Sequence, residues 1–422
     1  MTRSTWTTVA MVALVIGAGA GAHAADGPAD GPGPAPVVSS DPRAVPIGPP
    51  APPAGDDVVR AVEQGIAFLL GAQEGEGNAE WPYEGVYRVR GRIPIGYRIG
   101  GTGIVAEALV MLPGYAADAR RKDAVARACR FVCDGTREPL MSPEYDAGYD
   151  VRGWGYCYGA RMLLALRAAG AVPEGMADAV DAALRWYLQA IERTEIPQVG
   201  GWNYARQPGI DTPCPMSPFM TAPCLAVLFE AKRQGLDVDA AVVDRALAAL
   251  ERCRTDDGNF AYSADRPARD PARSIPGAIG RMTCGEATLM RAGRARADDV
   301  RRAVQAFLDH WRELEKRRQQ QGTHVPPYGV APYYFFFGFW HAADAVELLP
   351  EAERPDLRRQ LAHLLFMVRD ADGTWDDRVF PRSRNFGTAM ALTALLRPSL
   401  PEPARWDAPR APNAPPAAEG SR

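Results

Sequence analysis

The feature that most constrains the fold of this chain is an alternation of two kinds of apolar segment, repeated six times at intervals of about 60 residues. Segments of the first kind carry their apolar residues on one helical stripe, as Val58, Val62, Ile66 and Leu69 do. The striped segments begin near Asp57, Arg120, Gly175, Val238, Asp298 and Arg354. The segments of the second kind are apolar nearly all round and span Gly101–Leu112, Tyr156–Ala169, Met216–Ala231, Gly280–Ala292, Tyr333–Leu349 and Phe386–Leu396.

This alternation predicts two concentric layers of helices. A helix with one apolar stripe exposes its other side to solvent, whereas a helix that is apolar nearly all round is buried on both sides. Period-two alternation of the kind that indicates strands is almost absent. We therefore expect an all-α fold, an (α/α)6 toroid of six outer and six inner helices, with an open α-solenoid as the structural alternative.

A turn motif recurs between the two helices of several repeats. The first copy runs from Gly65 through Gln73 to Trp81, another ends in Gly200-Gly201-Trp202, and the last ends in Gly373-Thr374-Trp375. Glycine permits the tight reversal after the outer helix, and an aromatic side chain can cover the turn and hold neighbouring hairpins together. We expect these tryptophans to serve packing.

The two ends of the chain differ in composition from the repeats. Arg3, an apolar stretch and Ala22-His23-Ala24 have the pattern of a signal peptide. The apolar stretch is shorter than the roughly 20 residues that cross a bilayer, which disfavours the alternative of a retained membrane anchor. We expect an exported protein, periplasmic or secreted, with a signal peptide at 1–24, a Pro/Gly-rich disordered linker at 25–55, the toroid domain at 56–396 and a disordered tail at 397–422.

Composition limits the partners. The chain has 422 residues, of which 47% are hydrophobic. Its formal net charge is −3, whereas nucleic-acid-binding domains carry a basic face. We expect no nucleic-acid partner and no integral membrane span. The seven cysteines show no framework spacing, and Cys214 and Cys224 are the one candidate disulfide pair.

The repeat resembles that of the squalene and oxidosqualene cyclases and of the protein prenyltransferase β-subunits. The copy from Gly65 to Trp81 is close to the Gln-Trp motif of this family, and the resemblance covers nearly the whole folded unit. It implies an (α/α)6 toroid with an apolar central cavity. It does not identify the reaction, because such a fold hosts several chemistries.

The catalytic signatures of that family are missing. The cyclases use a D-x-D-D motif, which does not occur here, and the carboxylate pairs Asp256-Asp257 and Asp376-Asp377 lie in turn motifs. The zinc ligands of the prenyltransferases would align with Tyr334, Phe336 and Thr388, which are not ordinary zinc ligands. We expect neither cyclase nor zinc prenyltransferase chemistry, no bound metal and no cofactor.

A third toroid, the thioester domain of the complement and macroglobulin proteins, is echoed by the stretch Thr283-Cys284-Gly285-Glu286-Ala287. A thioester needs a glutamine where this chain has Ala287, so that chemistry is also not expected.

A ligand site is expected where the inner helices begin. Parallel inner helices gather their N-termini at one end of the ring, and this end favours an anionic group. Polar and aromatic residues there and in the ring could bind an amphiphilic ligand, although the same residues could simply cap helices and pack the core. The candidate ligand-binding residues are Tyr156, Arg281, Tyr333, Phe337, Trp340 and Arg384.

The candidate catalytic residues are the ionisable side chains of the inner segments. His341 and Asp344 are three residues apart on one helical face, so the carboxylate could orient the imidazole. Glu286, one hairpin earlier, would complete an acid-base group. The structural alternative is a buried pair in which His341 and Asp344 satisfy each other.

These observations favour a binding protein that holds an apolar, isoprenoid-like small molecule in a central cavity. The alternative is an enzyme on the same scaffold, either a divergent terpenoid-type transferase or cyclase or a carbohydrate-active (α/α)6 lyase or hydrolase. A lipid binder would have a closed aromatic cavity, whereas a glycan enzyme would have a long open groove. A scaffold that the Pro-rich arm tethers to protein partners is a third hypothesis.

Overall fold

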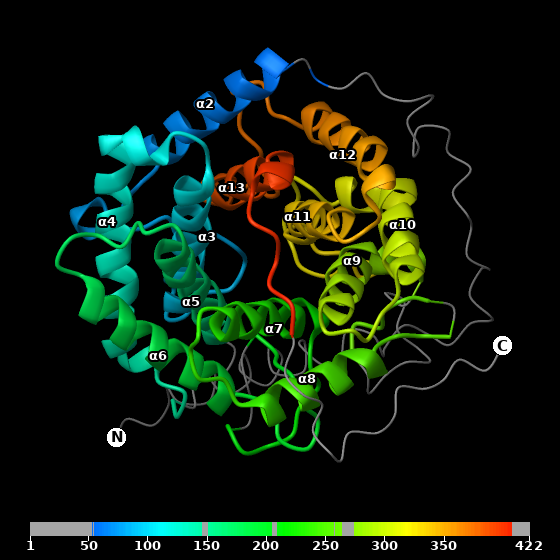
Figure 1. Ribbon diagram of the computed structural model, residues 1–422, viewed down its shortest axis with the longest axis horizontal. Coiled ribbons are helices and arrows are strands. Elements are labelled where there is room, and N and C mark those ends of the chain that lie inside the picture. Colours follow the sequence, from blue (N-terminus) through cyan, green and yellow to red (C-terminus); the bar gives the residue numbers. More distant parts are fainter. Residues whose placement is uncertain are drawn as a thin grey trace, which may run out of the picture.

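The computed structural model describes residue 53 and residues 55–145, 151–204, 209–256, 258–263 and 274–406. This part of the chain folds into a ring of helical hairpins (Figure 1). The outer helices are α2 (Gly55–Gly71), α4 (Ala119–Asp134), α6 (Ala177–Arg193), α8 (Ala240–Arg252), α10 (Ala297–Glu315) and α12 (Arg354–Met367). The inner helices are α3 (Ile95–Met111), α5 (Arg152–Ala168), α7 (Pro218–Arg233), α9 (Ile275–Arg291), α11 (Tyr334–Val346) and α13 (Ser383–Leu395).

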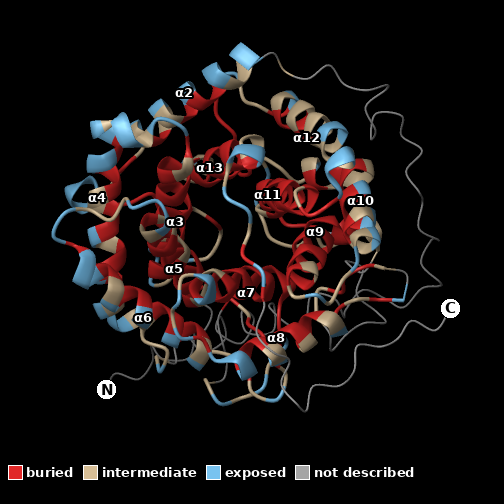
Figure 2. Cartoon of the chain, in the orientation of Figure 1, coloured by how far each residue is buried: buried red, intermediate tan, exposed pale blue. Residues whose placement is uncertain are grey.

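Burial distinguishes the two layers as the sequence predicts. In α3 every residue except Arg98 and Met111 is buried, whereas α2 buries only the stripe Ala61, Val62, Gly65 and Leu69. Figure 2 shows inner helices that are buried almost throughout and outer helices that are exposed on one side. The predicted (α/α)6 toroid is therefore confirmed.

The inner helices depart from their predicted bounds mainly at their beginnings. Helix α3 begins at Ile95 rather than Gly101, and α9 at Ile275 rather than Gly280, because glycine and polar residues in the first turns interrupt the apolar pattern. Among the described residues, extended pairing is limited to isolated bridges such as Val89 with Arg92.

Each of these turn tryptophans joins the outer helix before it to the inner helix after it. The indole nitrogen of Trp81 donates to the carbonyl of Leu69 at the end of α2, and its backbone N–H donates to the hydroxyl of Thr102 in α3, at 2.6 and 2.9 Å. Trp202 and Trp375 repeat both bonds, with the carbonyls of Ile191 and Leu365 and the hydroxyls of Thr221 and Thr388. The packing role expected for these tryptophans is therefore confirmed. The hydrogen bond to a threonine of the inner helix was not expected from the sequence.

The inner helices run parallel. Close contacts join the starts of neighbours, since Gly96 lies against Val151 and Gly103 against Tyr158 along α3 and α5. The N-termini therefore gather at one end of the ring, here called the mouth, which is formed by the loops that precede the inner helices. The end where the inner helices terminate is called the rear.

Residues 397–406, here called the strap, correct the expected start of the disordered tail. After α13 the strap runs across the ring towards α7 (Figure 1). Trp406 is buried and stacks on Phe229 of α7 with ring centroids 5.5 Å apart, and its N–H donates to the carbonyl of Arg291. The apolar surface that Trp406 covers explains why this short Pro-containing segment is ordered.

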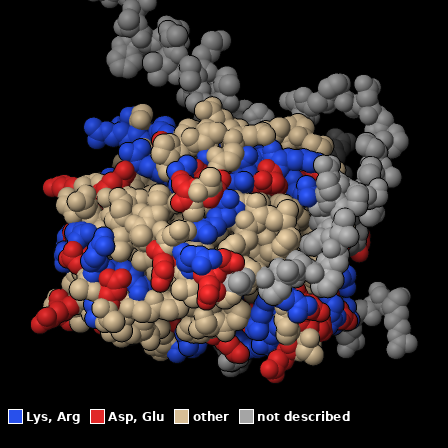
Figure 3. Space-filling view, turned by 90° about the horizontal axis from the view of Figure 1, so that it is seen from above, with Lys and Arg blue, Asp and Glu red and all other residues tan. Residues whose placement is uncertain are grey.

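Other expectations fare differently. None of the seven cysteines forms a disulfide; Cys224 is buried in α7 while Cys214 lies in the preceding loop, so the candidate disulfide is not formed. The residues expected to form a signal peptide, and nearly all of those expected to form the linker, lie outside the described residues. Within those residues, no helix combines the length and the hydropathy that crossing a bilayer requires. Positive and negative side chains are interspersed on the face that Figure 3 shows.

Candidate functional site

Aromatic side chains from different hairpins meet at the mouth. The ring of Tyr83, in the loop before α3, lies 4.9–5.3 Å from the rings of Tyr97, Trp154 and Phe386, which stand in the first turns of three inner helices. A second group forms where the ring of Phe219 stacks on that of Tyr334 at 3.7 Å. These contacts form a layer of aromatic side chains at the mouth.

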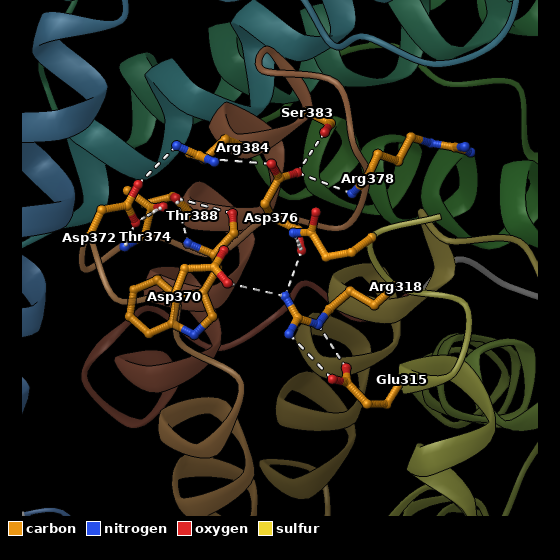
Figure 4. Close-up of polar contacts among 12 residues, drawn as sticks. Glu315, Arg318, Asp370, Asp372, Thr374, Asp376, Arg378, Ser383, Arg384 and Thr388 are labelled. Atoms are coloured by element: carbon orange, nitrogen blue, oxygen red, sulfur yellow. Dashed lines mark hydrogen bonds and ion pairs between the residues drawn. The ribbon is translucent and has the colours of Figure 1, made fainter. Parts of the chain in front are cut away.

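Two consecutive carboxyl groups lie beside this aromatic layer. Asp376 and Asp377 follow the turn residue Trp375 and precede α13, so the repeat itself carries them to the mouth. Asp376 is buried and accepts hydrogen bonds from the hydroxyl of Ser383 at 2.6 Å and the backbone N–H of Arg378 at 3.1 Å (Figure 4). Burial nevertheless raises the pKa of Asp376 above its usual value.

Asp377 differs sharply from its neighbour. It is fully buried, and neither of its carboxyl oxygens has a hydrogen-bond partner among the described residues. Burial raises its pKa to about 8; the positive charge of Arg378 opposes this shift, and the charge of Asp376 adds to it. A carboxyl group with this pKa carries its proton at neutral pH.

Arg378 holds this segment in place. Its Nε donates to the phenol oxygen of Tyr83 at 2.9 Å, and its Nη1 donates to the carbonyl of Gly322 at 2.9 Å. The same 316–333 loop reaches the acidic pair itself, because the backbone N–H of Gln319 donates to the carbonyl of Asp377. The loop therefore lies against the backbone of the acidic pair and against Arg378.

Arg318 anchors the loop from below (Figure 4). It donates to the carbonyl of Asp376 at 2.9 Å and to Glu315 at 2.7 Å, and it lies 3.6 Å from Asp370. Together with Arg384, whose Nε lies 3.4 Å from Asp376, it surrounds the acidic pair with positive charge.

The three candidate catalytic residues are not brought together. Glu286 is paired with Arg254 at 2.5 Å, on the side of α9 that faces the outer layer. His341 and Asp344 lie inside the ring towards the rear, where Asp344 pairs with Arg397 at 2.5 Å rather than with the imidazole. Burial lowers the pKa of His341 to about 3, against the opposing charge of Asp344. The spacing that places residues on one helical face does not show which partner each one meets.

The candidate ligand-binding residues also separate. Tyr156 is buried and bonded to the carbonyl of Met141, and Arg281, also buried, donates to the carbonyls of Phe260 and Gly277 at 3.1 Å. Tyr333 lies at the mouth, where its hydroxyl is bonded to that of Tyr204.

The other three of these residues differ in depth. Phe337 and Trp340 are buried inside the ring, the latter under the guanidinium of Arg161 at 4.2 Å. Arg384 pairs with Asp372 at 2.8 Å beside the acidic pair. Tyr333 and Arg384 thus belong to the mouth, and their roles in binding remain predictions.

Neither a closed aromatic cavity nor a long open groove is seen among the described residues. Two hollows among the described residues have volumes of about 30 and 20 Å³, against the 300 Å³ or more of typical small-molecule sites. The larger lies at the rim of the mouth between Tyr145 and Tyr204, and the smaller between α11, α12 and α13. The part of the chain that the structure describes shows no apolar central cavity of the expected kind, and the aromatic side chains of α11 pack on one another and on their neighbours.

The described residues hold no group of three or more His, Cys, Asp or Glu side chains placed to bind a metal ion. Asp377 is the residue that sequence reasoning missed. A usable signal was present, since a consecutive carboxylate pair directly preceded an inner helix whose N-terminus belongs to the mouth.

The fold defines the protein as an (α/α)6 toroid, and comparison with known proteins supports this class. No family model matches the sequence, and no curated protein matches it. Among solved structures, an α-1,6-mannanase from Salegentibacter sp. is similar with a TM-score of 0.51 and 10% identity, over 81% of this chain and 99% of the mannanase.

Unsaturated glucuronyl hydrolases share the fold to the same degree. The enzyme from Streptococcus agalactiae has a TM-score of 0.50 and 11% identity over 82% of this chain and 93% of its own. The enzyme from Bacillus sp., described as responsible for the degradation of glycosaminoglycan, has a TM-score of 0.50 and 12% identity over 83% and 98%. At these identities the likeness establishes the fold alone, and the resemblance to the cyclase and prenyltransferase family gains no support.

Proposed function

We propose that this protein is a carbohydrate-active hydrolase that cleaves a glycosidic bond at the mouth of the ring, with Asp377 as the proton donor. The observation that carries the proposal is the state of Asp377, a buried carboxyl group without a hydrogen-bond partner in the described structure and with a pKa of about 8. Such a carboxyl group is protonated at neutral pH, and its proton is not donated to any neighbouring group of the described structure. A general acid for glycoside cleavage needs this property.

The reaction needs a second carboxyl group, and Asp376 is the candidate. Asp377 would transfer its proton to the glycosidic oxygen as the bond from this oxygen to the anomeric carbon breaks. Water would add to the anomeric carbon and give its proton to the carboxylate of Asp376. The hydrogen bonds from Ser383 and from the backbone of Arg378 stabilise the ionised form of Asp376, as this role requires.

The aromatic layer suits a sugar substrate. Sugar rings present apolar faces that pack on aromatic side chains, and Tyr83, Tyr97 and Trp154 lie close to the acidic pair. Because Asp377 is fully buried here, substrate can reach it only after a movement at the mouth, and the 316–333 loop, which contacts Arg378 and the backbone of Asp377, is the candidate for this movement. The proposal therefore includes opening of this loop.

The similar structures support the class of reaction. The mannanase and the glucuronyl hydrolases act on glycans, and a mannanase variant with alanine at two consecutive aspartates is described as inactive, in a structure similar to this one with a TM-score of 0.50 and 10% identity. The present chain also carries a consecutive pair at the mouth. Secretion would place such an enzyme with extracellular glycans, and it stays a prediction from the N-terminal sequence.

The test is hydrolysis by the purified full-length chain of a defined panel: α-1,6-linked manno-oligosaccharides, unsaturated glucuronyl disaccharides and neutral gluco-oligosaccharides, with products measured by mass spectrometry. We expect turnover of at least one class and a loss of roughly 100-fold or more in Asp377→Asn. Asp356→Asn, on the exposed face of α12, is the control and should keep full activity. No turnover on the panel, or full activity of Asp377→Asn, would contradict the proposal.

A further inference from the structure

A second cluster of charged side chains lies inside the ring towards the rear, away from the acidic pair at the mouth. Each member comes from a different element, four from inner helices and one from the strap. We call it the axial cluster; it consists of Glu107 of α3, Arg161 of α5, Arg291 of α9, Asp344 of α11 and Arg397 of the strap.

Two of its three arginines have carboxylate partners. The Nε of Arg161 donates to both carboxylate oxygens of Glu107, at 2.8 and 2.7 Å. Arg397 pairs with Asp344 at 2.5 Å, and together with the other nearby charges it lowers the pKa of Asp344, although burial alone would raise it. These pairs use up the two carboxylates of the cluster.

Arg291 is left without a carboxylate. It is 7% exposed, and no Asp or Glu of the described residues lies within ion-pair distance of it. Its Nε has no hydrogen-bond partner in that part of the chain, and its one hydrogen bond runs from Nη2 to the hydroxyl of Thr288 at a long 3.4 Å. Burial lowers its pKa to about 10; the charge of Asp344 opposes this shift, and the charges of Arg161 and Arg397 add to it.

The charges therefore do not balance. Three arginines face two carboxylates, and His341, which borders the cluster, is held neutral by a pKa of about 3. An unpaired buried charge is costly, and removing one partner of a buried pair usually destabilises a protein strongly. The carbonyl ends of the inner helices at the rear reduce this cost, but none of them accepts a hydrogen bond from Nε of Arg291.

The cluster is also reachable by a small solute. Arg161 lies between Glu107 of α3 and Trp340 of α11, which stand on separate inner helices, yet 23% of its side chain is accessible. The side chain of Asp344 is 12% accessible.

We propose that the axial cluster binds one small monovalent anion of the halide class, such as chloride, in contact with Arg291. One negative charge balances the single excess positive charge and provides an acceptor for the unpartnered Nε. Because Arg397 belongs to the strap and the carbonyl of Arg291 accepts the N–H of Trp406, the anion also fastens the strap to the rear of the ring. This site is independent of the hydrolase proposed at the mouth.

The first experiment measures the melting temperature of the full-length chain as sodium gluconate is exchanged for sodium chloride or bromide at constant ionic strength. We expect a saturable rise of roughly 1–3 °C for the wild type. Arg291→Met should lose this rise. The control Arg405→Met, an exposed arginine of the same strap, should keep it. A flat wild-type response, or a rise with phosphate but with neither halide, would overturn the proposal.

The second experiment locates the ion and does not depend on whether Arg291→Met folds. Crystals of the wild-type protein grown in sodium bromide should show an anomalous peak in contact with Nε of Arg291. The absence of a peak at the axial cluster would overturn the assignment, even if halides stabilised the protein through another site.

Discussion

Arg378 and Tyr83 join the last hairpin of the ring to the first, because Nε of the buried arginine donates to the phenol oxygen at 2.9 Å. The contact closes the mouth beside Asp377. Burial raises the pKa of Tyr83 far above its usual value, so the phenol stays neutral and remains available as the acceptor. This hydrogen bond lies beside the proposed acid and is one of several contacts that close the ring, together with the Arg382–Glu74 ion pair and the packing of Phe386 on Tyr83.

Tyr83→Phe should destabilise the protein by about 1–3 kcal/mol, because it leaves a buried guanidinium nitrogen without an acceptor. Urea unfolding at neutral pH measures this. Tyr115→Phe is the matched control, since Tyr115 is half-buried at the rear and its ring lies near Arg121; the change should cost less than about 0.5 kcal/mol. Equal unfolding free energies for the wild type and Tyr83→Phe would contradict the role given to this bond.

Asp377→Asn should alter the dependence of stability on pH. The folded-state pKa of about 8 lies above the ordinary value of 3.8, so ionisation favours the unfolded state and the wild type loses stability as pH rises between these values. Asparagine cannot ionise. We therefore expect the variant to gain several kcal/mol over the wild type at pH 8 and little near pH 4.

Urea unfolding at pH 4.5, 6 and 8 checks this, with Asp356→Asn as the control, which should follow the wild type. A stability difference that is the same at every pH would show that the carboxyl group of Asp377 is not held protonated.

His341→Gln should act on the acid side. The folded-state pKa of about 3 lies below the ordinary 6.5, so the contribution of neutral His341 is present above pH 6.5 and is lost as pH falls towards 3. Glutamine removes this loss, and the variant should unfold at a lower pH than the wild type. Acid titration followed by circular dichroism measures the midpoint, and His363→Gln on α12 serves as the comparison.

Gly103→Ala should destabilise the protein by more than about 2 kcal/mol. A Cβ at this position of α3 would lie 2.2 Å from the carbonyl oxygen of Tyr158 in α5, so the two helices would have to separate. Gly280→Ala in α9 is the matched control, because its Cβ would meet nothing closer than 3.6 Å. Alanine there should stabilise the helix by about 0.5–1 kcal/mol. Thermal unfolding that ranked the two variants in the reverse order would contradict the packing described.

Trp406→Ala should release the strap. It removes the aromatic ring that stacks on Phe229 and should cost about 2–4 kcal/mol. Amide hydrogen exchange should then speed up at the N–H of residue 406, which is bonded to the carbonyl of Arg291. Arg405→Ala, on the exposed side of the same strap, should change neither quantity, and slow exchange in Trp406→Ala would show that the stacking does not hold the strap.

The sequence predicted the helices better than their ends. Apolar periodicity is a local property, so the striped α2 and the uniformly apolar α3 were identified with their correct layers. The starts of α3 and α9 were missed because Arg98 and Gly277 interrupt the apolar pattern at the mouth. The strap was missed because one buried Trp406 in a Pro-containing segment has no periodicity to reveal it.

The site was much less predictable. His341 and Asp344 share a helical face, yet the strap supplies Arg397 as the partner of Asp344, and nothing local indicates this. Asp377 looked like part of a turn motif, and its complete burial is a result of tertiary packing that the local sequence does not show.

The alternation of striped and uniformly apolar segments by itself determined that the chain forms a double ring of helices. The reason is that the apolar periodicity of each helix determines whether it is buried on one side or on both. The tertiary structure alone decided which charged side chains meet, at the mouth and in the axial cluster. The reason is that closure of the ring brings together loops and helices far apart in sequence, and the protonation and pairing of buried groups depend on those neighbours.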